Sequence, residues 1–545
     1  MGVAAQGWVI PLLSMIETAR LELLLFAAFF FVLGAFDELV MDGAWLACLI
    51  SGKGRSHRLG APMPAQLGAP IALFVPAWRE AKVIAPMIRH ALAAWPHADL
   101  RIYAGCYVND PATRAAMEAG GAGDPRLRIV INEVPGPTTK GQCLNRIYRA
   151  MREDEAREGI RFRAVLLHDA EDMVHPDALT LIDRALDEAD FVQIPVRPEM
   201  QVASPWVGNH YADEFADAHV REMVVRDWLG AGLPAAGVGC AFSARALAQV
   251  AERRGNGGGG AGGNPFDPLA MTEDYELGML IGGKGSLPGG KGGTFLRVRA
   301  HDGSLVATRA FFPSRLDTAV RQKSRWVHGI AFDGWDQLGW SLRPVELWMR
   351  LRDRRGPLTA LVLAAGYMLV VLTAVLWLAE QAGLYSPGPL PTLVYWVLIA
   401  TTAAFAWRAI VRFVIVGREY GWGEGLGSVL RIPVGNVIAI IAARRAIFRY
   451  AASLRGVPAR WDKTEHDRHA AARDCRRDLA GAARPGALRA AAPAGGFAPA
   501  RRGRAFTAPS ASACPDPAPD GSFWSSPARS ARPAPMVGRC LGSLA

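Results

Sequence analysis

The chain is 545 residues long, 51% of its residues are apolar, and its formal net charge at pH 7 is +11. This length accommodates two or three domains, and the apolar share predicts that part of the chain is embedded in a membrane. The charge does not indicate a nucleic-acid partner, because residues 469–545 hold eleven Arg against four Asp and no basic groove with interleaved aromatic residues occurs elsewhere.

Seven cysteines, an odd number without any Cys-x-x-Cys pair, predict neither a disulfide framework nor a zinc site. They are typical of reduced thiols in a cytosolic domain. The first apolar run lacks a preceding basic segment and a small-residue cleavage site, so the sequence predicts no cleavable signal peptide.

Three apolar segments have the length and composition of membrane spans: residues 21–36, extended to about 41, then residues 358–379 and residues 390–407. Basic residues follow the first segment, precede the second and follow the third. The positive-inside rule then places the amino terminus outside and residues 51–357 in the cytoplasm. A fourth apolar stretch, residues 426–443, contains Arg431 and is followed by three Arg, so we expect an interfacial helix on the cytoplasmic face.

Asp37, Glu38 and Asp42 lie near the end of the first predicted span. Carboxylates are costly at membrane depth and often mark function there, and Arg408 or Arg412 are the predicted partners. A span that simply ends at this point explains the three acids equally well.

Four short apolar runs in the first third of the chain predict β-strands: residues 70–75, 100–107, 127–131 and 165–168. Stretches with helical spacing separate them, so strand and helix alternate and predict a parallel sheet. Ligands of such sheets bind beyond the carboxyl ends of the strands. Polar side chains follow each run in turn: Trp78, Arg79 and Glu80; Asn109 and Asp110; Lys140; and Asp169, Glu171 and Asp172.

These four polar groups together indicate a nucleotide-diphosphate site. A carboxylate suits a base or sugar, a lysine suits phosphate, and the acidic cluster at Asp169, Glu171 and Asp172 offers the hard oxygens that Mg²⁺ or Mn²⁺ prefers. A helix N-cap supplied by Asp172 or Asp177 is the alternative explanation of the acidic cluster.

Residues 206–228 predict a helix whose titratable side chains are His210, Asp213, Glu214, Asp217 and His219. Their spacing among apolar residues favours a solvent-exposed face over a metal site.

Two glycine-rich stretches, residues 255–263 and 282–293, predict flexible loops. Residues 278–284 have the glycine and lysine spacing of a phosphate-binding loop, but Gly285 stands where such a loop requires Ser or Thr. The segment from about residue 469 is rich in Ala, Pro, Arg, Gly and Ser, so we expect it to be disordered.

Two further motifs carry little weight alone. Thr272-Glu273-Asp274 lies between the glycine-rich stretches, and Gln322-Lys323-Ser324-Arg325-Trp326 lies on a basic, predicted helical segment that by itself indicates only a membrane-proximal helix. Together with the acidic cluster and in this order, the motifs resemble the inverting family-two glycosyltransferases with a GT-A fold, especially the membrane-integrated polysaccharide synthases.

The local sequence is most similar to the bacteriophage adsorption protein B group of inner-membrane glycosyltransferases, over about residues 20–467. This resemblance rests on nine segments in order: FVPAWRE (74–80), YVNDP (107–111), GPTTKGQCLN (136–145), LHDAEDMV (167–174), QIPV (193–196), PAAGVGCAFS (234–243), LAMTEDYELG (269–278), AVRQKSRWVHGI (319–330) and WDKTEHD (461–467).

The resemblance implies roles for the residues that bind the donor. Glu80 and Asp110 would hold the nucleoside, and Lys140 would approach the nucleotide phosphates. Asp169 and Glu171 would hold Mg²⁺ or Mn²⁺, and the acid adjacent to Glu171, Asp172, is the alternative second ligand because the usual motif has Asp at the position of Glu171.

The resemblance also implies the catalytic residues. Asp274, with Glu273 beside it in the motif, would be the general base. Gln322 and Arg325 would neutralise the leaving diphosphate, and Trp326 would stack on the acceptor or close the donor site.

The resulting expectation is an α/β protein of GT-A fold with a mixed, Rossmann-like sheet, plus transmembrane helices. Its divisions are a transmembrane helix (1–50), a cytoplasmic GT-A domain (51–350), two transmembrane helices (351–408), interfacial helices (409–467) and a disordered tail (468–545). We therefore expect a multi-pass protein of the bacterial inner membrane. Its catalytic domain would lie in the cytoplasm, and membrane lipids would surround its helices.

The implied activity is metal-dependent, inverting transfer of a sugar from a nucleotide sugar, first of all a UDP-sugar, to a glycan or lipid-linked acceptor. An outer-membrane export or receptor partner is also implied. Two alternatives stay open: a polyprenyl-phosphate glycosyltransferase, and a non-catalytic assembly subunit of a phage-receptor or secretion system.

Overall fold

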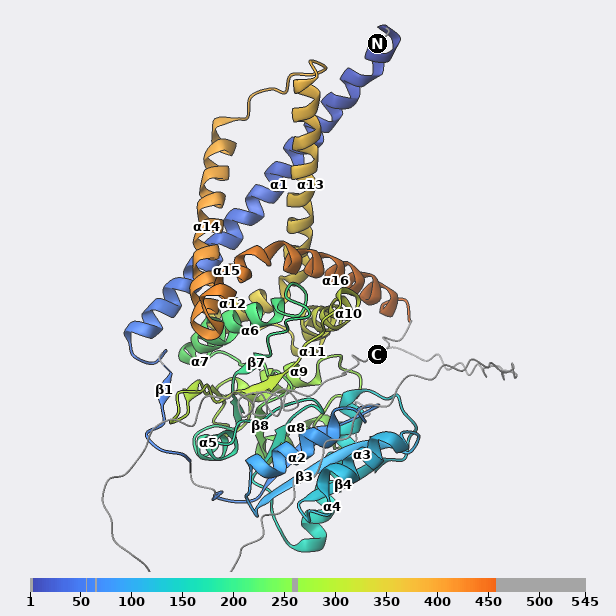
Figure 1. Ribbon diagram of the computed structural model, residues 1–545, viewed down its shortest axis with the longest axis vertical. Helices are drawn as coiled ribbons and strands as arrows, with labels where there is room; N and C mark the ends of the chain where they lie inside the picture. Colours follow the sequence, from blue (N-terminus) through green and yellow to red (C-terminus); the bar gives the residue numbers. More distant parts are fainter. Residues whose placement is uncertain (1–2, 55, 64–65, 257–262, 457–545) are drawn as a thin grey trace, which may run out of the picture. The chain divides into compact units, whose positions relative to one another are not determined.

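The computed structural model describes residues 3–456, except for residues 55, 64–65 and 257–262 (Figure 1). The predicted disordered tail, residues 468–545, and the segment WDKTEHD lie outside the described residues.

A seven-stranded sheet forms the centre of the domain, in the order β4-β3-β2-β5-β8-β6-β9. The first four strands of this order are parallel, β8 is antiparallel to both β5 and β6, and β9 is parallel to β6. The sheet is therefore mixed, as the resemblance implied, and all four strands predicted from apolar runs are present. The strands are β2 (Ile71–Pro76), β3 (Leu100–Tyr107), β4 (Leu127–Asn132), β5 (Ala164–Leu167), β6 (Phe191–Gln193), β8 (Cys240–Ser243) and β9 (Gly293–Phe295).

Helices cover both faces of the sheet. Successive residues of β2 point to opposite faces, so Phe74 belongs to one apolar cluster while Leu73 and Val75 belong to the other. Helices α4 and α8 pack into the first cluster, and α2 and α5 pack into the second. Burial on both faces explains why these strands read as continuous apolar runs. The helices are α2 (Ile84–Ala94), α3 (Pro111–Gly121), α4 (Lys140–Glu158), α5 (Ala178–Ala185) and α8 (Ala244–Asn256).

Shorter elements surround the edge of the sheet at which the strands β2 and β5 end. Two small strand pairs form, β1 with β10 and β7 with β11. Their bounds and those of the nearby helices are β1 (His57–Arg58), β7 (Val196–Pro198), β10 (Val298–Arg299), β11 (Thr308–Ala310), α6 (His210–Asp217), α7 (Met223–Leu229), α9 (Glu273–Gly282), α10 (Leu316–Val327), α11 (Gly334–Leu338) and α12 (Pro344–Arg354), with π-helical turns at Ala218–Glu222 and His328–Asp333.

Among the residues that the structure describes, three helices are long and apolar enough to cross a membrane: α1 (Val3–Ile50), α13 (Gly356–Gln381) and α14 (Thr392–Tyr420). Helices α1 and α13 contain the first two predicted spans, and α14 begins two residues after the start of the third; all three helices are longer than predicted. Helix α1 packs against both α13 and α14. The stretch predicted to be interfacial forms α15 (Trp422–Leu430) and α16 (Ile432–Ser453), bent by 49° at their junction. In Figure 1, α16 runs transversely to α13 and lies beside α10.

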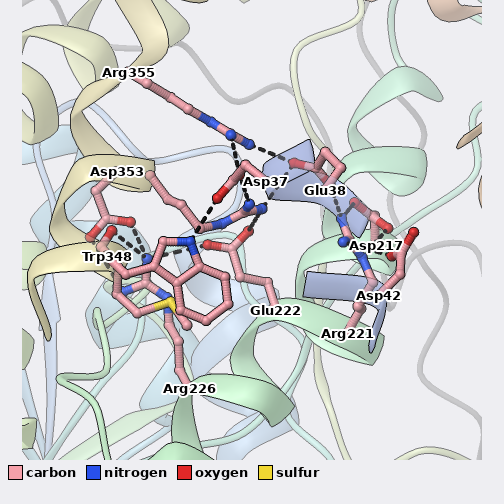
Figure 2. A network of polar contacts seen from close by, with 12 residues as sticks. Asp37, Glu38, Asp42, Asp217, Arg221, Glu222, Arg226, Trp348, Asp353 and Arg355 are labelled. Atoms are coloured by element: carbon pink, nitrogen blue, oxygen red, sulfur yellow. Dashed lines mark hydrogen bonds and ion pairs between the residues drawn. The ribbon is translucent and has the colours of Figure 1, made fainter. Parts of the chain in front are cut away.

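The three acids in the second half of α1 form ion pairs (Figure 2), and of the three only Asp42 is buried. Arg408 of α14 pairs with Asp42 at 3.1 Å, as predicted, whereas Arg412 pairs with Asp213 of α6 instead. Arg352 and Arg355, from the end of α12 and the start of α13, both contact Asp37. The three acids are therefore part of the interface between α1 and the rest of the protein.

These contacts extend into a larger cluster, the junction network. Arg221 of the first π-helical turn pairs with Glu38 at 2.9 Å and with Asp42 at 3.0 Å. Arg226 of α7 pairs with Asp353 of α12. The network comprises six carboxylates and five guanidinium groups, namely Asp37, Glu38, Asp42, Asp217, Glu222 and Asp353 with Arg221, Arg226, Arg352, Arg355 and Arg408.

The solvent-exposed face predicted for residues 206–228 is wrong. His210 and Asp213 are fully buried and His219 is nearly so. The reason is that α6 packs against α14 and α16, so its polar side faces these helices and pairs with their cations. Asp213 contacts both Arg412 and Arg431. Residues 278–284, whose phosphate-loop match the sequence already rejected, run from α9 into the following loop.

Candidate active site

A cavity lies at the carboxyl ends of β2 and β5, the edge at which parallel sheets bind ligands. The sequence analysis assigned donor-binding, metal-binding or catalytic roles to eleven residues, and ten of them line this cavity. The cavity therefore combines motifs from β5, α4, α9 and α10. The exception is Asp110. Segments that are far apart in the chain therefore converge on one site.

Asp110 instead caps α3 and supports a neighbouring loop. Its Oδ1 accepts a hydrogen bond from the amide of Thr113 at 3.3 Å, and its Oδ2 accepts one from the amide of Arg79 at 2.5 Å. Arg79 has a φ of 55°, which a non-glycine residue rarely adopts, so the second bond stabilises an unusual loop conformation. The predicted contact of Asp110 with a nucleoside stays a prediction.

All three acids of the cluster after β5 line the cavity, but Asp172 is also held by hydrogen bonds within the cluster. Asp172 is buried, and its Oδ2 is hydrogen-bonded to His168 Nδ1 at 2.8 Å and to the amide of Asp169 at 2.9 Å. Burial raises the pKa of Asp172, although the hydrogen bond from His168 opposes the shift. The Asp169 side chain is 34% exposed and, like Glu171, lines the cavity.

Lys140 enters the cavity from the first turn of α4. A capping box fixes that turn: Thr139 Oγ1 accepts from the amide of Gln142 at 3.2 Å, and Gln142 Oε1 accepts from the amide of Thr139 at 3.1 Å. Lys140 Nζ lies 2.7 Å from Asp169 Oδ1 and 4.0 Å from Glu273 Oε1. Burial disfavours the charged lysine, but the nearby carboxylates outweigh it and raise the Lys140 pKa, so the ammonium group stays charged.

Glu273 and Asp274 occupy the first turn of α9. Burial and then the charge of Asp274 raise the pKa of Glu273 to about 7. Burial also raises the pKa of Asp274, with Lys140 opposing the shift. Asp274 Oδ1 accepts a hydrogen bond from the amide of Tyr275 at 2.8 Å, which orients the carboxylate. A carboxylate with a raised pKa is a stronger proton acceptor near neutral pH.

Gly237 contributes to the site through its lack of a side chain. Its φ is +75°, and a Cβ at this position would lie 2.2 Å from Asp274 Oδ2. Glycine therefore lets the loop before β8 approach the Asp274 carboxylate directly. The sequence reasoning included this loop in the segment PAAGVGCAFS but gave Gly237 no role. The two glycines just before a short apolar run are the sequence feature that could have indicated such a close approach.

Three residues of α10 complete the cavity. Within the described part of the chain, the buried Oε1 of Gln322 has no hydrogen-bond partner, which is unusual for a buried polar atom and leaves it able to accept from a ligand. Arg325 lies close enough that its charge lowers the pKa values of both Glu273 and Asp274, against the larger effect of burial. Trp326 lies against the aromatic rings of Tyr211, Phe215 and Phe312.

An aromatic wall closes the side of the cavity near β2 and β3. The Trp78 and Tyr107 rings meet edge to face at 5.0 Å, and the Tyr107 hydroxyl is 2.6 Å from Thr138 Oγ1. Both rings line the cavity, and the sequence reasoning assigned no role to Tyr107. A lone tyrosine at the end of a strand carries no distinguishing signal in one sequence.

The donor set of the cavity suits a hard divalent cation that shares its coordination with a substrate. Among the described residues, no three His, Cys, Asp or Glu side chains are arranged to hold a metal ion by themselves. Mg²⁺ in nucleotide sites is usually bound by one or two carboxylates together with substrate phosphates. Asp169 and Glu171 supply that number, and the ammonium group of Lys140 beside Asp169 demonstrates that this carboxylate accepts a cation.

Comparison with known proteins agrees with this geometry. Residues 69–329 match the family described as "Glycosyltransferase like family 2". Bacteriophage adsorption protein B of Escherichia coli (strain K12) is 32% identical over 430 residues, which cover 73% of this chain and 55% of that protein. Bacteriophage N4 adsorption protein B of Escherichia coli O157:H7 gives the same values. The chain thus spans about half the length of the curated relatives it matches.

Solved structures with partial similarity include two sugar transferases. Mannosyltransferase PcManGT from Pyrobaculum calidifontis, in complex with GDP-Man and Mn²⁺, has a TM-score of 0.46 at 17% identity, covering 79% of this chain and 99% of that chain. Glucosyl-3-phosphoglycerate synthase from Mycobacterium tuberculosis, in complex with Mn²⁺, UDP and phosphoglyceric acid, has a TM-score of 0.30 at 19% identity, covering 50% and 79%. From the family match and the ordered motifs, residues 69–329 are a family 2 glycosyltransferase domain, in a chain related to bacteriophage adsorption protein B.

Proposed function

We propose that this protein transfers a sugar from a nucleotide-diphosphate sugar, first of all a UDP-sugar, to a surface glycan or a lipid-linked acceptor. The observation that carries the proposal is the meeting of Asp169, Asp274 and Arg325 in one cavity, although they come from three separate elements. A carboxylate for a cation, a carboxylate with a raised pKa and a guanidinium group are the three charges that such a transfer needs.

The donor is proposed to bind along the carboxyl ends of β2 and β5. Glu80 would contact the nucleoside and Lys140 the phosphates, since an ammonium group at a helix N-terminus attracts anions. Asp169 and Glu171 would hold Mg²⁺ or Mn²⁺. When bound, the cation supplies positive charge to the diphosphate oxygens of the donor.

Asp274 is proposed to be the general base. Its carboxylate takes the proton of the acceptor hydroxyl while that oxygen forms a bond to the anomeric carbon, and the bond from this carbon to the diphosphate oxygen breaks. A single displacement of this kind inverts the configuration at the anomeric carbon. Such general-base catalysis typically contributes about 10² to 10⁴ in rate.

The residues of α10 are proposed to stabilise the leaving group. Negative charge grows on the nucleoside diphosphate as the bond breaks, and fixed positive charge in a water-poor cavity stabilises it more than water does. Arg325 supplies that charge. Gln322, whose Oε1 is unbonded within the described residues, would accept a hydrogen bond from a hydroxyl with that oxygen or donate one to a phosphate with its Nε2, and Trp326 would close the site.

The membrane location is part of the proposal. With residues 1–50 and 351–408 spanning the bacterial inner membrane, residues 51–350 would form the cytoplasmic catalytic domain and residues 409–467 would lie at the interface. The three long apolar helices of the described chain are few for a polysaccharide channel. We therefore propose a lipid-linked acceptor, or a passage completed by an export partner.

The test is nucleoside-diphosphate release by membranes that contain the full chain. A panel of UDP-, GDP- and dTDP-sugars is supplied with Mg²⁺ or Mn²⁺, with and without chelator. Asp274→Asn should abolish release, and Asp317→Asn, at a side chain that is 54% exposed on α10, should not. Equal release by Asp274→Asn would refute the base assignment. No release from any donor would favour the assembly-subunit alternative, and release only with a polyprenyl-phosphate acceptor would favour the other alternative.

A further inference from the structure

His168 is a buried polar side chain on an apolar face of the sheet. It directly follows β5, whose side chains alternate between the two apolar clusters, so its ring belongs to the same face as Ala164 and Leu166. His168 is 1% exposed, and its ring centroid lies 5.9 Å from that of Trp95, which is part of that cluster. An apolar side chain would fill this position without burying a polar ring, so the reason for a histidine lies in what its ring bonds.

The imidazole is bonded to the acid that holds the turn after β5. His168 Nδ1 lies 2.8 Å from Asp172 Oδ2, and the same oxygen accepts a hydrogen bond from the amide of Asp169 at 2.9 Å. The amide of Asp172 donates in return to the carbonyl oxygen of Asp169 at 3.3 Å. The backbone of Asp169 is thus bonded to Asp172 in both directions, and His168 holds the Asp172 carboxylate from the apolar side.

The far end of this loop is anchored to the rest of the domain. Trp95 Nε1 donates a hydrogen bond to the carbonyl oxygen of His175 at 3.0 Å. Met173 exchanges two backbone hydrogen bonds with Arg309 of β11, at 2.7 and 2.9 Å. The loop is therefore bonded at both ends, and the side chain of Asp169, 34% exposed, extends from it into the catalytic cavity.

We propose that His168 is a positioning residue for the divalent cation: through Asp172 it holds the turn that directs the Asp169 carboxylate into the cavity. This inference rests on the proposed function, in which Asp169 and Glu171 bind Mg²⁺ or Mn²⁺ together with the donor diphosphate. It assigns Asp172 to the support of these ligands, because its Oδ2 already accepts two hydrogen bonds. Loss of a group that orients a metal ligand typically lowers metal affinity about 10- to 100-fold.

The experiment measures Mn²⁺ binding and requires no turnover. Mn²⁺ is titrated into the full-length protein in detergent with UDP or GDP, and free Mn²⁺ is measured by electron paramagnetic resonance. His168→Leu removes the hydrogen-bond donor, whereas His168→Asn keeps one. His97→Leu is the matched control, because His97 is also buried, its ring is hydrogen-bonded to Thr180 Oγ1 at 3.0 Å, and it lies outside the lining of the catalytic cavity.

We expect His168→Leu to weaken Mn²⁺ binding about tenfold or more, and His168→Asn and His97→Leu to bind Mn²⁺ as the wild type does. Thermal unfolding of the same preparations separates this loss from a loss of stability, which both leucine variants should share. Equal Mn²⁺ affinity of His168→Leu and the wild type would overturn the inference and leave the proposed function intact. A wild type that binds no Mn²⁺ with either nucleotide would refute the metal assignment of the proposed function and this inference together.

A second variant tests the inference even if His168→Leu does not fold. Asp172→Asn keeps the size of the side chain and an oxygen that can accept from His168 and from the amide of Asp169. We therefore expect this variant to fold and to bind Mn²⁺ more tightly than Glu171→Gln, which loses a carboxylate ligand. Equal losses of affinity in the two variants would show that Asp172 binds the cation directly, and would overturn its assignment to the support of Asp169.

Discussion

Two clusters of buried charge in this protein differ in their balance. The catalytic cavity has six carboxylates against two cations, namely Glu80, Asp169, Glu171, Asp172, Glu273 and Asp274 with Lys140 and Arg325. The junction network has six carboxylates against five arginines. The first cluster has an excess of negative charge that a bound cation can offset, whereas the second is nearly neutral without any ligand.

The pKa shifts follow this balance. In the cavity, burial raises the pKa values of Glu273 and Asp274, because too few cations are present to offset it. In the junction network, burial acts in the same direction on Asp217 and Glu222, but the arginines outweigh it and lower both pKa values. Carboxylates of the first kind are suited to proton transfer, and those of the second kind are committed to ion pairs.

The largest expected effect tests the unbalanced cluster. Asp274→Asn should lower the rate of sugar transfer by about 10² to 10⁴, because the proton acceptor is lost. The free energy of unfolding should stay the same or rise, since the substitution removes a buried charge from an acidic excess. Transfer rates and thermal unfolding of the same preparations measure both. A large loss of stability would mean that Asp274 is held by balanced pairs, contrary to the comparison.

The next effect tests the balanced cluster. Asp37→Asn leaves Arg352 and Arg355 with one carboxylate fewer, so we expect a loss of about 2 to 3 kcal/mol in the free energy of unfolding, between the values for exposed and fully buried pairs. The exposed pair of Asp317 with Arg321 provides the control, and Asp317→Asn should cost less than about 1 kcal/mol. Unfolding midpoints in detergent serve as the measurement. Equal, small losses in both variants would remove the distinction between the clusters.

Both the stability and the transfer rate should depend on pH through Glu273. Because the pKa of Glu273 is raised from 4.5 to about 7, the unfolded chain loses this proton at a lower pH than the folded protein does, so stability should fall as pH rises from about 4.5 to 7. The transfer rate should rise over the upper part of that window as the Glu273–Asp274 pair loses its last proton.

Glu273→Gln removes one of the two interacting charges. It should flatten the dependence of stability on pH and move the midpoint of the rate profile to lower pH. Unfolding midpoints and transfer rates between pH 5 and 8 test both. An unchanged midpoint in this variant would contradict the coupling between the two carboxyl groups.

The smallest effect concerns the link between the two clusters. The Tyr275 hydroxyl donates a hydrogen bond to Asp353 of the junction network at 2.9 Å, and the Tyr275 amide donates to Asp274. Tyr275→Phe should lower the transfer rate about two- to tenfold, the range of a single hydrogen bond, while the donor KM stays the same. Tyr385→Phe, which removes a hydroxyl bonded to Glu17 far along α1, is the control. A changed donor KM with an unchanged rate would show that Tyr275 does not position the base.

The sequence predicted the strands and the convergence of motifs for physical reasons that are local. The strands β2, β3 and β5 are buried on both faces, so each reads as a continuous apolar run, and parallel strands end at one edge. The sequence could not show that Asp110 is a helix cap, because an Asp at the end of a strand can either contact a ligand or cap the next helix.

Long-range pairing was the part that the sequence could not predict. The partner Arg408 was found because it flanks a predicted span, but Arg221 lies on a helix whose polar face resembles an exposed one. Whether such a face meets water or another helix depends on packing that one sequence does not reveal. The same is true of Gly237, whose approach to Asp274 exists only in the folded loop.

The ion pairs of α1 have a consequence for how the protein is made. Helix α1 leaves the ribosome before its partners, since Asp42 pairs with Arg221, 179 residues later, and with Arg408, 366 residues later. At typical rates of translation the second partner follows after about 20 to 70 s. Helix α1 is therefore made well before it can reach its final contacts, and its carboxylates lack these arginine partners until the later segments emerge.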